Sequence, residues 1–125
     1  PLRLGNMEAR RDWSYAPDQI EGVCLALQQS FPSDYVLGSG ETHSVSEFFE
    51  EAKSAAGLSK VPYIEDMDSY RPWDIEILQS NPIKAKAALG WVQKTSFRKL
   101  VSIMVKYDLD LVQSEIRKQD YGYPF

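Results

Sequence analysis

The sequence of 125 residues has one cysteine, one histidine and no long apolar segment. One cysteine excludes an internal disulfide, and a zinc site built from this chain alone is not expected, because such sites draw on several Cys and His ligands. No hydrophobic run approaches the roughly 20 residues that cross a bilayer, so we expect no membrane span. The lone thiol of Cys24 fits a reducing compartment, and we expect a cytoplasmic protein.

Positive charge is also scarce, because 14 Lys and Arg are outnumbered by 18 Asp and Glu, which leaves a net charge of −4. A general nucleic-acid binder needs a basic face, so we expect no nucleic-acid partner. Any recognition of phosphate must then come from a few placed arginines. The chain also lacks a G-x-G-x-x-G segment, a Walker loop and internal repeats. A self-contained dinucleotide-binding fold is therefore not expected.

The first third of the chain predicts a strand, a helix and a second strand. Residues 1–13 have no helical period and predict a short strand followed by a loop. Ser14 then offers an N-cap, and Pro17 suits a first helical turn, so we expect a helix that ends near residue 29. Its apolar positions at helical spacing predict a buried stripe, which consists of Ile20, Val23, Cys24 and Leu27. A brief strand is expected over residues 34–37.

The rest of the chain predicts three helices and one more strand. Ser44 and Glu47 have capping-box spacing and begin a helix that stops at Gly57. A short strand is expected over residues 61–64. Asn81 and Pro82 together signal the start of a short helix that ends at Gly90, and a last helix begins at about residue 96.

These elements indicate an α/β fold that is rich in helices and has only short strands. The chain has neither the long hydrophobic strands nor the βαβ rhythm of a complete doubly wound sheet. With 43% hydrophobic residues it can bury one core, so we expect a single region over residues 1–125. Within it, residues 1–13 form a strand and loop, 14–113 a helical α/β unit and 114–125 a polar tail.

Two short segments carry arginines that suit phosphate. Arg11 lies between Arg10 and the Asp12–Trp13 pair, and its planar five-donor fork could bind a phosphate at the exit of a loop. Taken alone, this segment fits a surface arginine beside its neighbouring acid better than a ligand contact.

The second segment contains Arg71, which Pro72 biases towards an extended conformation. Asp74 follows three residues after Arg71, and its acceptor-only carboxylate suits a ribose diol. An arginine and an aspartate at this spacing also commonly pair with each other on a surface, so this segment alone leaves both interpretations open.

Four stretches of the chain together resemble the GDP-mannose 4,6-dehydratase family. Residues 4–13, LGNMEARRDW, resemble the family's LGN-x-[DE]-A-x-RDW stretch, and residues 34–45, DYVLGSGETHSV, resemble DYVLATGETHSV. Residues 70–72 resemble YYRP-x-E, and residues 84–109 resemble the family's KAK..LGW.....F..LV..MV..DL ending. The resemblance spans about residues 2 to 113 in the family's order and spacing.

The resemblance implies an extended short-chain dehydrogenase/reductase fold, in which an NADP-binding Rossmann domain precedes a smaller C-terminal region that holds the sugar-nucleotide. This chain is similar to that C-terminal, substrate-binding region alone. The implied enzyme is a lyase that converts GDP-mannose to GDP-4-dehydro-6-deoxy-mannose, the precursor of GDP-fucose. By position, Arg11 and Arg71 correspond to family arginines that contact the diphosphate. Asp74 falls where the family usually has a Glu that contacts the guanosine ribose, and Asn6 lies in the loop that lines the nucleotide pocket.

The sequence also departs from the family pattern. Asp74 is shorter than Glu, Ser14 replaces a Gly and Trp73 replaces a small residue, which puts affinity in doubt more than identity. The glycine fingerprint, the catalytic Thr/Ser and Glu, and the Tyr-x-x-x-Lys pair belong to the Rossmann half, so we expect no catalytic residue here. NADP and the Rossmann half would then come from another part of the polypeptide or from a separate chain. The other expected partners are GDP-mannose or a related GDP-sugar, and further copies in a homo-oligomer.

Two other interpretations remain open. The chain could be a non-catalytic relative that serves as a binding or structural subunit of a larger assembly, which the altered Asp74 and Trp73 allow. It could also belong to a different sugar-nucleotide epimerase or reductase, which residues 40–45, GETHSV, disfavour.

Overall fold

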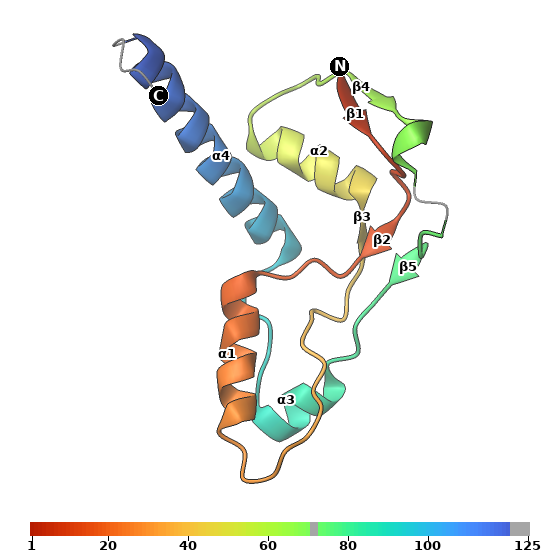
Figure 1. The fold of residues 1–125 in the computed structure, drawn as a ribbon, viewed down its shortest axis with the longest axis vertical. Helices are drawn as coiled ribbons and strands as arrows, with labels where there is room; N and C mark the ends of the chain where they lie inside the picture. The colour runs from red at the N-terminus through yellow and green to blue at the C-terminus, as the bar shows by residue number, and fades with distance from the viewer. Residues whose placement is uncertain (71–72, 121–125) are drawn as a thin grey trace.

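The structure is a computed structural model that describes residues 1–70 and 73–120. Its described helices are α1 (Ala16–Leu27), α2 (Val45–Ala55), α3 (Ile83–Leu89) and α4 (Phe97–Asp120), with a single 3₁₀ turn at Met67–Ser69. Its described strands are β1 (Leu2–Leu4), β2 (Arg10–Arg11), β3 (His43–Ser44), β4 (Tyr63–Glu65) and β5 (Ile77–Leu78). The molecule is elongated, with α1 and α3 towards one end, α2 and α4 towards the other, and the short strands along one side (Figure 1).

The strands form two small sheets. β1 pairs in parallel with β4. β2 is the centre of the second sheet, where it pairs antiparallel with β3 and parallel with β5. In this register Arg11 lies opposite His43 on one side and opposite Leu78 on the other, so the RDW segment is held between two segments distant in sequence.

Helices α2 and α3 begin and end for local reasons. The Ser44 hydroxyl accepts from the Glu47 amide at 3.0 Å, which confirms the expected N-cap of α2. The reciprocal bond of a capping box is replaced, because the Glu47 carboxylate binds Arg10 and His43 instead. Gly57 and Gly90 follow the ends of α2 and α3 with φ of 70° and 66°, left-handed values that glycine adopts without strain.

The core at the α1–α3 end forms around Trp91. Trp91 is 2% exposed and packs with Ala85 and Leu89, against partly buried residues of α1 and of the loop that follows it. The Trp91 indole donates to the Asp18 carbonyl at 2.7 Å. The Asp18 carboxylate, itself buried, accepts from the amides of Lys94 and Thr95 and so fixes the turn before α4.

The other end packs α2 against α4 and the loop between β1 and β2. Leu100 and Val101 of α4 are buried, as is Met7 of the loop. Phe48 of α2 contacts the Trp13 ring with centroids 4.7 Å apart, and it meets Phe97 edge-on at 6.0 Å. Phe48 of α2 therefore faces the interior of this end, although no residue of α2 is fully buried.

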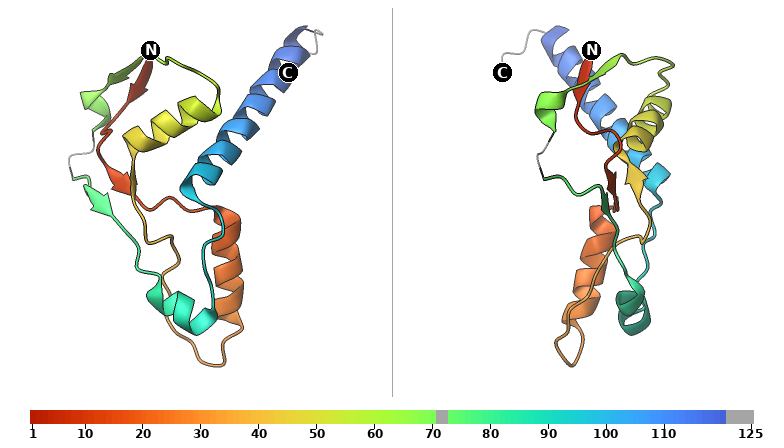
Figure 2. Two further views of the ribbon diagram at one scale, coloured as in Figure 1. Left: turned by 180° about the vertical axis from the view of Figure 1, so that it is seen from behind. Right: turned by 90° about the vertical axis from the view of Figure 1, so that its right-hand side faces the viewer.

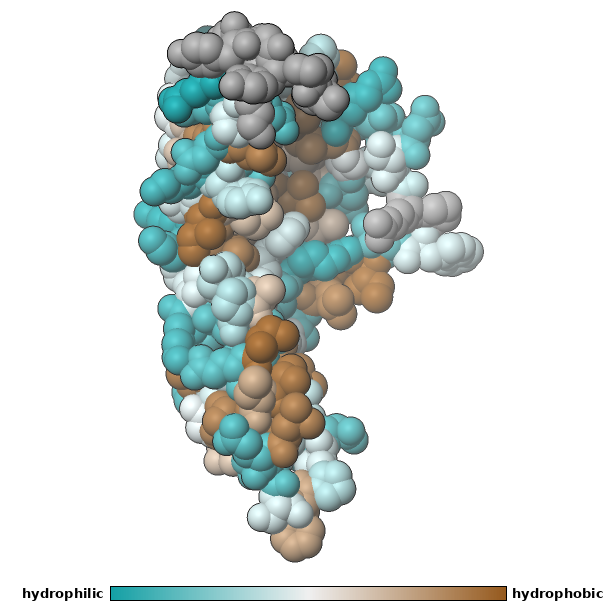
Figure 3. Space-filling view, turned by 60° about the vertical axis from the view of Figure 1, so that its left-hand side comes forward, coloured by the Kyte–Doolittle hydropathy of each residue, from teal (hydrophilic) through white to brown (hydrophobic). Residues whose placement is uncertain are grey.

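The predicted buried stripe of α1 is wrong for this chain. Ile20, Val23 and Leu27 are 60%, 44% and 81% exposed, and Cys24 is exposed as well, so its expected core position is also wrong. Helix α1 instead turns Gly22 and its neighbours Leu25 and Ala26 towards the Trp91 core. Figure 3 shows hydrophobic side chains gathered at the surface of the half of the molecule that contains α1.

Two local predictions near α1 also fail. Tyr15, not Ser14, is the N-cap of α1, because the Ser14 hydroxyl donates to Asp12 instead. Residues 34–37 form no strand, since no described strand lies beside them to complete a ladder, and Tyr35 and Leu37 pack on the Trp91 core. The predicted strand at 61–64 is confirmed with a small shift, as Tyr63–Glu65.

Helix α4 begins where the pattern predicts but continues to Asp120. The first part of the expected polar tail is therefore helical, and residues 121–125 lie outside the described part. Figure 2 shows that the later turns of α4 extend past α2. Among the described helices, none is long and apolar enough to cross a membrane.

Candidate functional site

Two of the predicted site residues meet in the structure. The Nη2 atom of Arg11 lies 2.6 Å from the Oδ1 atom of Asp74, although the two residues are 63 positions apart. The Arg11 and Asp74 side chains are 27% and 25% exposed, so the pair is partly buried and still reachable from solvent. The structure thus joins the RDW segment to the segment that was predicted to contact a ribose.

The main chain of β2 holds the Arg11 guanidinium in place. Its Nη1 atom donates to the Arg10 carbonyl at 2.8 Å and, at 3.4 Å, to the Glu76 carbonyl just before β5. The Arg10 amide donates to the same Glu76 carbonyl at 2.7 Å, and this hydrogen bond joins β2 to the residue just before β5. A fork anchored at one nitrogen can present its remaining donors in a fixed direction.

Arg10, which the sequence did not single out, has a structural role. Its guanidinium donates to the Thr42 hydroxyl and carbonyl and to the Glu47 carboxylate. Hydrogen bonds from His43 and Arg10 lower the pKa of Glu47 against the opposing effect of burial. Its partner Glu47 did stand out in the sequence, as the third residue of α2, but there its spacing from Ser44 indicated a role in the helix cap.

Asp12 is the centre of the polar network beside Arg11. Its Oδ1 atom accepts from the Ser39 amide at 3.0 Å and from the Ser39 hydroxyl at 2.7 Å. Its Oδ2 atom accepts from the Gly40 amide at 3.0 Å and from the Ser80 hydroxyl. Burial would raise the pKa of Asp12, but these hydrogen bonds outweigh burial and lower the pKa to about 2. Asp12 therefore stays ionised and ties two loops to the end of β2.

A hollow of about 370 Å³ lies against Arg11 and this network. One side comes from Asp12 and Ser14, and the other from the extended segment at residues 36–37 and from residues 78–80. Arg11 and Asp12 are among the residues that line the hollow, and apolar Val36, Leu37 and Leu78 form part of its wall. This combination suits a ligand with an anionic group and a flat or apolar part.

Two predicted residues are not joined to this pair. The Asn6 side chain accepts from the Glu8 amide at 3.0 Å and turns the loop between β1 and β2, and no described hydrogen bond connects it to Arg11. Arg71, the second predicted diphosphate contact, lies outside the described residues, as does Pro72. Trp73 is described, and its side chain is 95% exposed.

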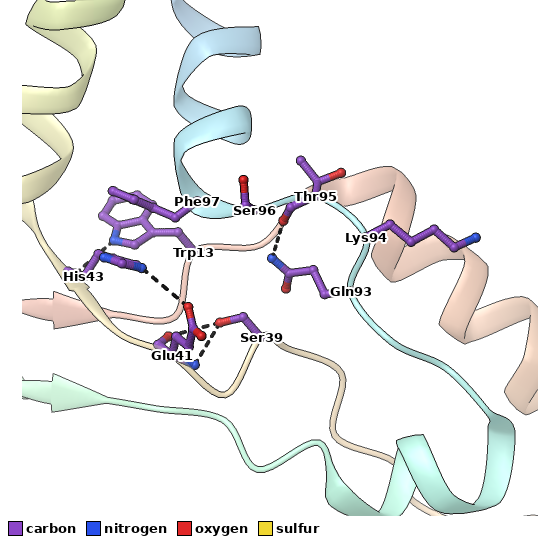
Figure 4. A pocket seen from close by; sticks show the side chains of 9 residues that line it. All are labelled: Trp13, Ser39, Glu41, His43, Gln93, Lys94, Thr95, Ser96 and Phe97. Atoms are coloured by element: carbon purple, nitrogen blue, oxygen red, sulfur yellow. Dashed lines mark hydrogen bonds and ion pairs between the residues drawn. The ribbon is translucent and has the colours of Figure 1, made fainter.

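A second hollow, of about 250 Å³, lies where the loop before α1, the segment that ends at β3 and the start of α4 approach one another (Figure 4). Trp13, His43 and Phe97 form its aromatic side, with the His43 and Phe97 rings stacked 3.8 Å apart. Gln93 donates to the Thr95 carbonyl, while its buried Oε1 atom has no partner among the described residues. Nothing in the sequence pattern pointed to this hollow, because its residues come from three separate stretches of the chain.

Neither hollow offers a metal centre in the part of the chain that the structure describes. No group of three or more His, Cys, Asp or Glu side chains gathers there in a way that could hold a metal ion.

Residues 1–104 match the family model described as GDP-mannose 4,6 dehydratase. GDP-mannose 4,6 dehydratase 2 of Arabidopsis thaliana is 42% identical over 123 residues, which cover 98% of this chain and 33% of the relative. The chain thus spans about a third of the length of the curated relatives it matches.

Two solved structures share the fold of this region. UDP-glucose 4-epimerase of Thermotoga maritima, solved with UDP-glucose, has a TM-score of 0.77 and 25% identity over 89% of this chain and 35% of its own. RMD from Pseudomonas aeruginosa, solved with NADPH, has a TM-score of 0.75 and 17% identity over 84% of this chain and 34% of its own. The mixed α/β arrangement of helices and short strands therefore matches part of an epimerase- and dehydratase-like fold.

Proposed function

The chain belongs to the GDP-mannose 4,6-dehydratase family, and from this membership we propose that it is the C-terminal region that binds the GDP-sugar. In this proposal the complete enzyme is a lyase that converts GDP-mannose to GDP-4-dehydro-6-deoxy-mannose. The chain holds the substrate and supplies no reacting group.

The observation that carries the proposal is the contact between Arg11 and Asp74. A surface arginine needs no partner from a distant segment, yet this one is anchored to main-chain carbonyls and meets Asp74 at 2.6 Å. Arg11 supplies a fork that matches the oxygens of a diphosphate, and Asp74 supplies an acceptor that matches ribose hydroxyls. The hollow that Arg11 helps to line gives the nucleotide a wall that includes Val36 and Leu37.

The described residues do not fit the NADP cofactor of the family. The chain has no glycine-rich strand–turn–helix segment that would bring a backbone close to a pyrophosphate. We therefore assign NADP, the hydride acceptor of the dehydration, to the part of the family enzyme outside these 125 residues. On this assignment the described residues bind and orient the sugar-nucleotide, and Asp12 keeps the loops beside Arg11 in place.

The direct test is titration of GDP-mannose against the protein as its gene encodes it, for the wild type and for Arg11→Ala. A charge-assisted fork contributes about 1.5–3 kcal/mol, so we expect Kd to rise roughly 10- to 150-fold. Arg3→Ala is the matched control, because it also removes one positive charge but from an exposed side chain that pairs with Asp66. Equal affinities for Arg11→Ala and Arg3→Ala would remove Arg11 from the site.

A second observation separates the enzyme from a non-catalytic subunit. If the encoding gene continues upstream into a glycine-rich strand–turn–helix and a Tyr-x-x-x-Lys, the chain is part of a complete dehydratase. If the reading frame begins near residue 1, a binding or structural subunit becomes the better assignment. Turnover of GDP-mannose with NADP by the 125-residue chain alone would contradict both assignments, because each of them treats these residues as non-catalytic.

A further inference from the structure

Arg10, the neighbour of Arg11, is held from the face of β2 that lies opposite the candidate site. Its Nε and Nη2 atoms donate to the Thr42 hydroxyl at 3.2 Å and to the Thr42 carbonyl at 2.8 Å. Its Nη1 atom donates to the Glu47 carboxylate at 2.9 Å. Successive side chains of a strand point to opposite faces, so Arg11 points the other way, towards Asp74. One face of β2 therefore carries the candidate site, and the other face is bound to the start of α2.

The attachment of Arg10 matters because β2 is very short. The strand consists of Arg10 and Arg11 alone, so few ladder hydrogen bonds fix its position. The Arg11 guanidinium takes its direction from this main chain, since its Nη1 atom donates to the Arg10 carbonyl at 2.8 Å. A shift of Arg10 therefore also moves the anchor of the Arg11 side chain. Binding groups act well only when they are held within about 0.5 Å of the productive geometry.

Glu47 joins three elements of the fold at this point. Its Oε1 atom accepts from Arg10 of β2, and its Oε2 atom lies 2.7 Å from Nδ1 of His43 in β3. Its amide donates to the Ser44 hydroxyl at 3.0 Å, which fixes Glu47 in the first turn of α2. A carboxylate held by the helix and bound on both oxygens can keep Arg10 in one place.

We propose that Glu47 is a positioning residue of the candidate site, which orients Arg11 through Arg10. This inference rests on the proposed function, in which Arg11 binds the diphosphate, and adds to it a residue that itself touches no ligand. It also accounts for the missing half of the predicted capping box, because the Glu47 carboxylate is directed at β2 and β3 instead.

The test is a double-mutant cycle in which GDP-mannose is titrated against the protein as its gene encodes it. Glu47→Ala should raise Kd roughly 3- to 10-fold, because a misplaced guanidinium loses part of its contact with the ligand. In the Arg11→Ala background the same change should raise Kd by less than about 1.5-fold, since no guanidinium remains to be positioned. Glu47→Gln keeps an oxygen that can accept from Arg10, so its Kd should stay within about twofold of the wild type.

The matched control is Glu51→Ala. It also removes a glutamate of α2 that pairs with an arginine, but this arginine is Arg98 of α4, at 3.1 Å, and not a residue of β2. Glu51→Ala should leave Kd unchanged. Thr42→Val is a milder second variant, which removes one acceptor of Arg10 and keeps the shape of the side chain. It should raise Kd about two- to threefold.

Three results separate this inference from the proposed function. The inference alone is overturned if Arg11→Ala weakens binding and Glu47→Ala does not, or if Glu47→Ala weakens binding equally with and without Arg11. If Glu47→Ala does not fold, an unchanged Kd for Thr42→Val overturns it instead. A wild type that binds no GDP-mannose, or an Arg11→Ala variant that binds as tightly as Arg3→Ala, would overturn the proposed function, and this inference with it.

Discussion

Replacing Asp12 with Asn tests the network that shapes the candidate site. The pKa of Asp12 falls from an ordinary 3.8 to about 2 in the folded chain. Lowering the pKa by this much corresponds to roughly 2 kcal/mol of stability, which solvent screening of a partly exposed group reduces to about 1–2 kcal/mol. The Asn amide would also direct N–H groups at the amides and hydroxyls that now donate to Asp12. We expect Asp12→Asn to lower the free energy of unfolding by about 1–3 kcal/mol at pH 7.

The pH dependence gives this prediction a second readout. Because the folded pKa lies below the unfolded one, the stabilisation is complete above about pH 4 and is lost as the pH falls through about 2. The wild type should therefore lose this contribution between about pH 4 and 2, and Asp12→Asn should not.

Urea unfolding across this pH range measures the effect on stability, and hydrogen exchange at the Ser39 and Gly40 amides measures it locally. The control is Asp34→Asn, an exposed residue of the same loop. If Asp12→Asn stays within about 0.5 kcal/mol of the wild type at pH 7, and both amides keep their protection, the reasoning is refuted.

Two further substitutions test the local structure. Ser44→Ala removes the hydroxyl that caps α2 at 3.0 Å, so the free energy of unfolding measured by urea titration should fall by about 0.5–2 kcal/mol. Ser44→Asn should recover most of this loss, and no recovery would argue against a capping role. Trp73→Ala should change stability by less than about 0.5 kcal/mol, because the indole is 95% exposed, and a larger loss in thermal unfolding would contradict that exposure.

The helices that depend on near neighbours could be predicted from the sequence. The cap at Ser44 and the stops at Gly57 and Gly90 involve groups within about four residues, so their chemistry is readable along the chain. The end of α1 was also placed to within two residues, at Leu27. These features need no knowledge of what packs against them.

Features that need a distant partner could not be predicted. Residues 34–37 have the composition of a strand, but a strand exists only when a neighbour completes its hydrogen bonds. Helical spacing located the apolar positions of α1, yet it could not say which face would find a core. Gly22 and Leu25 turn inwards because Trp91, far along the chain, packs there, and Cys24 is left at the surface.

The candidate site divides in the same way. The sequence by itself determined the residue types, because the order of the RDW, GETHSV and YRP segments indicated a sugar-nucleotide family and singled out Arg11 and Asp74. Only the tertiary structure decided that these two side chains form an ion pair and that Asp12 binds the loops around them. The physical reason is distance along the chain: the pair joins positions 63 apart, and the parallel pairing of β2 with β5 brings them together.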